Sequence, residues 1–214
     1  MATTRRVGTE KSKTRALILD STEQLLIEEG YAAISYRTLG AKAGVTGPLV
    51  QYYFPTFDDL FAALVRDRSE RTLRQLTQGL KTDRPLRAIW NYANNKNAAA
   101  LTAELTAVAN HRKKIRAEIA QAGEQARELA LDAVSRLAKT YTFAGAPVSA
   151  DVLVFLVTSI PRMVVLERSM GMETSLAETI EFFERFLDQV EPPDGDEPRP
   201  GPAVHGSEQD TADT

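Results

Sequence analysis

The sequence has no cysteine and only two histidines in 214 residues. Without cysteine, the chain has no disulfide framework, thiolate metal site or cysteine nucleophile. The histidines, His111 and His205, are far apart in the sequence, and no metal-spaced cluster or nucleophile beside a base accompanies them. A glycine-rich phosphate loop between a strand and a helix is missing as well. The sequence therefore argues against an enzyme, and we expect no cofactor and no metal.

Long hydrophobic runs are also missing. The longest, residues 152–157, is far shorter than the roughly 20 residues that a membrane helix needs. The N-terminus is charged and lacks the apolar segment of a signal peptide. We therefore expect a cytoplasmic protein without membrane contact. Hydrophobic residues still make up 43% of the chain, which is enough for a packed core.

The net charge of −3 is unevenly distributed along the chain. Residues 191–214 hold seven acidic residues and one arginine, so the rest of the chain carries +3, and residues 1–16 alone carry +4. A basic end is expected where a protein meets a polyanion such as DNA. We predict a disordered basic arm at 1–12 and a disordered acidic tail at 191–214. The arm either contacts DNA or only attracts it from a distance.

Apolar residues recur at helical spacing through most of the chain, without useful strand-like alternation or an internal repeat. Pro161 is expected to kink one of the helices. The predicted helices beyond the N-terminal segment span residues 56–80, 85–97, 98–110, 111–141, about 150–170 and 175–190, with Asp83 as an N-cap for the second of them. These patterns predict an all-α fold.

Residues 35–60 contain the start and stop signals of two short helices joined by a tight turn. Ser35 is a candidate N-cap for a helix over 36–42, and Gly44 supplies the positive φ that ends it. Thr46 is expected to cap the next helix with its hydroxyl, and Pro48 suits its first turn. In a helix-turn-helix, the second helix lies in the DNA major groove. With the preceding helix over 13–29, this segment predicts a three-helix DNA-binding domain.

The run EEGYAAISYRTLGAKAGVTGPLVQYYFPTFDDLF, residues 28–61, resembles the DNA-binding segment of the TetR family of transcriptional regulators. The matching features are Glu-Glu-Gly-Tyr, Ser-x-Arg-x-Leu, Ala-Gly-Val-Thr, aromatic-aromatic-Phe-Pro and acidic-acidic-Leu, in order and without a gap. The resemblance implies a helix-turn-helix domain over 13–56 and a helical ligand-binding and dimerisation domain over 57–190. It also implies double-stranded DNA with a palindromic operator as one partner, and a small-molecule effector as another.

The resemblance implies that eight residues on the two short helices and the turn between them contact DNA. They are Arg37, Thr38, Thr46, Gly47, Pro48, Gln51, Tyr52 and Tyr53. Tyr52 and Tyr53 are expected to reach outward. The family usually has tyrosine where this chain has Gln51, and often lysine where it has Phe57, and both family residues commonly touch phosphates. Gln51 either donates to a phosphate or pairs with adenine, and we favour the phosphate.

The ligand site is predicted among polar-tipped and adaptable residues on the C-terminal helices. The candidates are Trp90, Asn94, Asn97, Leu105, Tyr141, Phe155, Ser159 and Met163, with Tyr92 and Asn95 near them. The alternative is that Trp90 and Met163 are plain core and that the asparagines face water. A basic run, 111–114, either meets an anionic effector or is a solvated patch.

The last two helices are apolar on more than one face. In the first, the six consecutive apolar residues 152–157 point in all directions around the helix, and in the second, Phe182, Phe183 and Phe186 do not lie on one stripe. We therefore expect a homodimer through these helices. The predicted function is a DNA-binding repressor that its effector releases from the operator. The alternatives are a ligand-dependent corepressor or activator of the same fold, and a helical ligand-binding or interaction protein that has lost DNA binding.

Overall fold

The computed structural model describes residues 13–136, 141–143 and 145–192. The predicted basic arm and all but the first two residues of the predicted acidic tail lie outside this range. The described helices are α1 Lys13–Glu29, α2 Tyr36–Lys42, α3 Gly47–Tyr53, α4 Phe57–Gly79, α5 Pro85–Ala93, α6 Lys96–Ala109, α7 Lys113–Ser135, α8 Ala150–Ser169 and α9 Leu176–Val190. A 3-10 turn, η1 Tyr31–Ala33, and a two-stranded antiparallel ladder, β1 Thr142–Phe143 with β2 Ala146–Pro147, complete them. The predicted all-α fold is confirmed.

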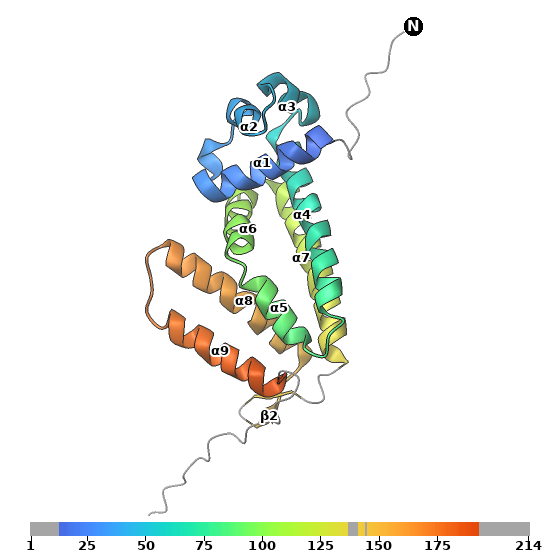
Figure 1. The fold of residues 1–214 in the computed structure, drawn as a ribbon, viewed down its shortest axis with the longest axis vertical. Helices are drawn as coiled ribbons and strands as arrows, with labels where there is room; N and C mark the ends of the chain where they lie inside the picture. Colours follow the sequence, from blue (N-terminus) through green and yellow to red (C-terminus); the bar gives the residue numbers. More distant parts are fainter. Residues whose placement is uncertain (1–12, 137–140, 144, 193–214) are drawn as a thin grey trace, which may run out of the picture.

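The helices form an elongated molecule with α1, α2 and α3 at one end (Figure 1). The long helices α4 and α7 pack along each other and lead away from that end. Helix α5 packs on α8, and α9 lies toward the opposite end of the molecule from α2 and α3. The short helices that are expected to meet DNA are therefore joined to the rest of the protein by the chain connection to α4 and by the packing of α1 on α4 and α6.

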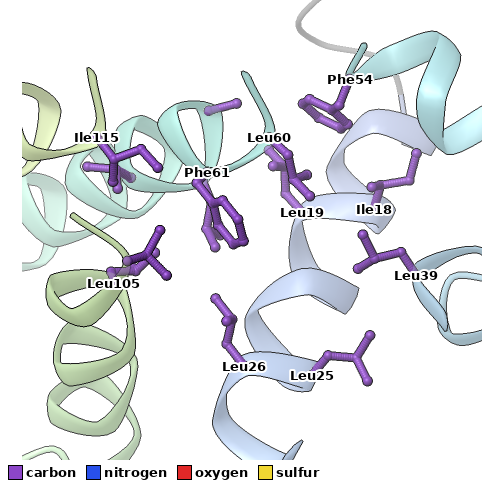
Figure 2. Close-up of a cluster of buried hydrophobic side chains, with 14 of the residues drawn as sticks. Ile18, Leu19, Leu25, Leu26, Leu39, Phe54, Leu60, Phe61, Leu105 and Ile115 are labelled. Carbon is purple, nitrogen blue, oxygen red and sulfur yellow. The ribbon is translucent and has the colours of Figure 1, made fainter. Parts of the chain in front are cut away.

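One hydrophobic core joins the N-terminal helices to α6 and α7. Buried side chains of α1 pack with Leu39 of α2, Phe61 of α4, Leu105 of α6 and Ile115 of α7. Figure 2 shows Phe61 between Leu105 on one side and the leucines of α1 on the other. A second core lies between α5, α7, α8 and α9. A movement of α6 or α7 would therefore displace side chains that pack directly against the N-terminal helices.

The turn between α2 and α3 has the predicted construction. Ser35 accepts the backbone N–H of Thr38, and the Thr38 hydroxyl accepts the N–H of Ser35, which completes a capping box. Gly44 has a φ of 65°. A Cβ on Gly40 would lie 2.8 Å from the carbonyl oxygen of Val45 and 2.9 Å from the nitrogen of Gly47, so only glycine lets the two segments come this close.

Thr46 departs from its predicted role. It occupies the N-cap position of α3, but its hydroxyl makes no capping hydrogen bond. Thr56, at the start of α4, does cap with its side chain, because its hydroxyl accepts the N–H of Asp59 at 3.1 Å. Residue type marks the position of a cap, whereas the side-chain rotamer decides whether the bond forms.

The two threonines give a matched prediction. Thr56→Ala should lower the free energy of unfolding by about 1 kcal/mol, because it removes a capping bond. Thr46→Ala should change it by less than about 0.5 kcal/mol, as is usual for an exposed side chain. Urea unfolding of both variants measures the difference. An equal loss in both would mean that the Thr46 hydroxyl caps α3 in solution.

Several helix boundaries in the middle of the chain differ from the sequence prediction. Helix α5 ends at Ala93, because Asn95 caps a new helix by accepting the N–H of Ala98 at 3.0 Å. Asp83 does not cap α5, since Arg84 takes that position without a side-chain bond. Helix α7 ends at Ser135 rather than at 141, and residues 137–140 lie outside the described range.

The missing cap of α5 is supplied from the other end of the chain. Glu191 is only 3% exposed, and its carboxylate accepts the N–H of Leu86 at 2.9 Å and of Arg87 at 2.8 Å. The Tyr141 hydroxyl donates to the same carboxylate at 2.5 Å, and burial together with this bond raises the pKa of Tyr141. The prediction that the disordered tail begins at residue 191 is therefore wrong for Glu191, which belongs to the folded core.

Candidate DNA-binding surface and ligand cavity

Helix α3 presents one exposed face at the end of the molecule. Val50 and the adjoining Phe54 are buried in the first core and fix the orientation of the helix. The residues left on the outer face are Pro48, Leu49, Gln51 and Tyr52, and Thr46 is exposed just before them. Leu49 was not predicted, because a seven-residue helix has too short a pattern to show which apolar residue is left out of the core.

The remaining predicted DNA residues are less free. Arg37 on α2 is exposed, but Thr38 is half-buried and donates its hydroxyl to the carbonyl of Ala33 at 2.7 Å. Gly47 lies under α2, where a Cβ would come within 3.2 Å of the Tyr36 carbonyl oxygen. Tyr53 is half-buried against the first core and meets the Tyr52 ring edge-on. The expectation that Tyr53 reaches outward is therefore not what the structure shows.

Phe57 has a packing role at the start of α4. Its ring stacks on Tyr36 with 4.6 Å between the ring centroids, and both rings pack against the first core. The Tyr36 hydroxyl lies 3.1 and 3.0 Å from the carbonyl oxygens of Phe54 and Pro55. Where a lysine would point to solvent, this chain uses an aromatic pair to hold α2 against α4.

A cavity of about 230 Å3 lies between α4, α5, α6, α7 and α8. Its α7 wall is made of small residues at helical spacing, among them Ala122, Gly123, Ala126 and Ala130. These residues leave the space, because they do not fill the distance between α7 and the facing helices. The polar groups on its walls are Arg68, Ser69, Thr72, Tyr92, Thr102, Arg127, Thr158 and Arg162.

The comparisons with known proteins fit this architecture. Residues 18–64 match the model of the bacterial regulatory proteins of the tetR family. This match covers most of α1, all of α2 and α3 and the first third of α4, with the capping box and the glycines described above. The DNA-binding segment of the chain is therefore of the TetR family. The match supports a DNA-binding transcription regulator, and no curated protein matches the chain.

Solved structures share the fold over most of the chain. A TetR transcription regulator from Haloarcula marismortui has a TM-score of 0.64 at 19% identity, over 82% of this chain and 96% of that one. A transcriptional regulator from Saccharomonospora viridis in complex with choline has a TM-score of 0.70 at 15% identity, over 83% and 97%. The fatty acid degradation regulator FadR from Bacillus halodurans has a TM-score of 0.63 at 16% identity, over 84% and 96%. At these identities the likeness shows a shared fold.

The structure does not bring the predicted ligand residues together. Of the eight, only Leu105 lines the cavity, and Tyr92, named beside them, lines it too. Trp90 and Tyr141 are buried in the second core, where Trp90 stacks on Phe183 and donates to Glu184. Two others, Asn94 and Asn97, lie at the break between α5 and α6, where Asn94 ends α5 and Asn97 is exposed.

The other three predicted ligand residues lie on the wrong side of α8 for this cavity. Phe155 is 56% exposed, Met163 is 53% exposed, and Ser159 lies between them. The residues of α8 that do line the cavity are their neighbours Val154, Thr158 and Arg162. Each predicted residue is therefore one position, about 100° around the helix, away from the cavity wall.

The exposed apolar residues of α8 form a continuous stripe. Val152, Phe155, Met163, Leu166 and Met170 follow one another at spacings of three, four or eight residues. Phe182 on α9 is exposed as well, although its ring meets Phe183 edge-on. We call these six residues the α8–α9 apolar face. None of the described helices has the length and apolar character of a membrane span.

Ion pairs tie the start of α4 to the start of α7. Arg112 pairs with Asp58 and donates to the Tyr31 hydroxyl at 2.9 Å. Lys114 lies 2.7 Å from Asp59, and its bond, with that from Thr56, lowers the pKa of the Asp59 carboxyl. Two of the four residues of the basic run at 111–114 are thus engaged with α4.

Proposed function

We propose that this protein is a homodimeric repressor that leaves a palindromic operator when a small molecule fills the cavity. Residues 13–56 would form the DNA-binding domain, and the helices from α4 to α9 would form the regulatory and dimerisation domain. The observation that carries the proposal is shared packing, because Val65 and Leu105 line the cavity and also belong to the first hydrophobic core. A molecule in the cavity would press directly on the core that supports α1 and α2.

Helix α4 would transmit that pressure to the DNA-binding helices. Its middle, from Val65 to Leu76, lines the cavity, and its first turn is fixed to α7 by Asp58 and Asp59. Packed helices shift as rigid units rather than deforming continuously. A shift of α4 against α7 would therefore change the distance between the two α3 helices of a dimer, and a fixed half-site spacing would no longer fit.

The α8–α9 apolar face supports the dimer. Large contiguous apolar patches are rare on monomers and mark interaction surfaces. Two copies of such a stripe can cover each other around a twofold axis, because the same patch serves both subunits. A twofold dimer places its two α3 helices on two halves of a palindrome.

The exposed face of α3 supports major-groove binding. Pro48 and Leu49 offer apolar contacts to thymine methyl groups, while Gln51 and Tyr52 carry hydrogen-bonding tips. Arg37 on the exposed side of α2 supplies a positive charge for a phosphate. We assign Gln51 to a phosphate oxygen, so it contributes affinity without sequence choice.

A mobility-shift titration on the DNA upstream of the protein's own gene tests the proposal. We expect specific binding whose log K falls with log salt by about 0.9 per phosphate contact. Gln51→Ala should weaken binding by a similar factor on the operator and on variants changed at one base pair. The matched control is Gln125→Ala on the exposed surface of α7, which should bind as the wild type does.

Three results would count against parts of this proposal. Salt-independent or absent binding would contradict DNA recognition by α3. A loss of preference at a single base pair in Gln51→Ala would show that Gln51 reads a base. A ligand that tightens operator binding would show a corepressor or activator rather than an effector-released repressor.

A further inference from the structure

The charges inside the cavity are not balanced. Arg68 is neutralised by Glu23, which lies 3.0 Å from it. Among the residues that the structure describes, Arg127 pairs only with Glu124, an exposed residue of the same helix at 4.0 Å. Within the described residues, no carboxylate lies at salt-bridge distance from Arg162. Two arginines therefore face the cavity with little or no counter-charge.

The two arginines are close enough to affect each other. Burial lowers the pKa of Arg162, and the positive charge of Arg127 lowers it further. Arginine nevertheless stays protonated in proteins, so both side chains keep their charge. Both residues are also partly open to solvent. Two like charges that line one cavity still repel each other, and an anion placed between them would relieve that repulsion.

The rest of the cavity wall is mostly apolar. Val65, Leu105, Ile119 and Val154 surround it together with the small residues of α7. At about 30 Å3 per water-sized group, a cavity of about 230 Å3 has room for roughly eight such groups. The space suits a short apolar chain or a single ring, with one charged end.

We propose that the effector is an organic monocarboxylate, with its carboxylate between Arg127 and Arg162 and its apolar body against Leu105, Ile119 and Val154. This inference rests on the proposed effector role of the cavity. Guanidinium groups match a carboxylate with paired hydrogen bonds, which an amide or alcohol cannot replace at full strength. A cationic ligand such as the choline in the Saccharomonospora viridis structure would be repelled by the same pair.

Isothermal titration calorimetry on the DNA-free protein tests this inference. The probes are the straight-chain carboxylates from butanoate to octanoate, with the amide and the alkylammonium of each length. We expect at least one carboxylate to bind at least ten times more tightly than its amide, and the alkylammonium ions not to bind. If no carboxylate binds more tightly than its amide, the inference is overturned.

Variants of the arginines sharpen the test. Arg162→Gln should weaken the best carboxylate about tenfold or more, because a charge-assisted bond is lost. It should leave the melting temperature of the ligand-free protein unchanged or higher, since it removes a repulsion. The matched control is Arg168→Gln on the same helix, whose side chain pairs with Glu173 at 3.5 Å outside the cavity and should leave binding unchanged. Equal carboxylate binding in Arg162→Gln and wild type would contradict the proposed site.

The calorimetry, together with a mobility shift on the operator in the presence of the carboxylate, separates this inference from the proposed function. Carboxylate binding that depends on Arg162 but leaves the operator complex intact would support the site and contradict effector release. Operator binding without any carboxylate preference would support the DNA-binding proposal and overturn the ligand class.

Discussion

Phe155→Glu should convert the dimer into a monomer and reduce operator affinity by a factor of about 100 or more. Phe155 is the most exposed phenylalanine on the α8–α9 apolar face, at 56%. In a twofold interface every substitution occurs twice, so the variant would bring two carboxylates into an apolar contact. Burying an unpaired charge costs several kcal/mol, which is enough to dissociate most dimers of moderate affinity.

Sedimentation velocity measures the first effect, and a mobility shift on the operator measures the second. Phe155 belongs to neither of the two hydrophobic cores, so the variant should keep the wild-type helical circular dichroism. Gln125→Glu adds the same charge to an exposed position on α7 and should remain a dimer that binds DNA. A Phe155→Glu protein that sediments as a dimer would place the interface elsewhere.

The sequence was sufficient for the helices of the DNA-binding domain and for most of their ends. Predicted and observed bounds agree at α1, which spans Lys13–Glu29, and at α2, which spans Tyr36–Lys42. The reason is local: Ser35, Gly44 and Thr56 act on backbone groups only a few residues away. Signals of this kind can be read from a short window of the sequence, without knowing how the helices pack.

The orientation of α8 could not be predicted in the same way. This helix is apolar on nearly all sides, so its pattern does not tell the cavity side from the exposed side. The choice of Phe155, Ser159 and Met163 over Val154 and Thr158 depends on where α4 and α7 lie. The run of small residues along α7 was the available signal for the cavity, because small residues on a long helix leave space against its neighbours.

Glu191→Ala should lower the melting temperature by roughly 6–12 °C. The substitution leaves the N–H groups of Leu86 and Arg87 and the hydroxyl of Tyr141 without their acceptor. Each buried donor left unpaired costs about 1–3 kcal/mol, so the three together cost about 3 kcal/mol or more. In a protein of this size each kcal/mol shifts the melting temperature by about 2–4 °C.

Two further proteins isolate the effect of this one carboxylate. Glu191→Gln keeps an acceptor oxygen and should lose clearly less stability than Glu191→Ala. A chain that ends after Pro192 keeps Glu191 and removes only residues 193–214, whose acidic, proline-rich composition cannot bury enough apolar surface to offset the entropy of ordering. That shortened chain should melt with the full-length protein in differential scanning calorimetry. If it melts as low as Glu191→Ala, residues beyond 192 stabilise the fold, and the carboxylate does not account for the stability at this end of α5.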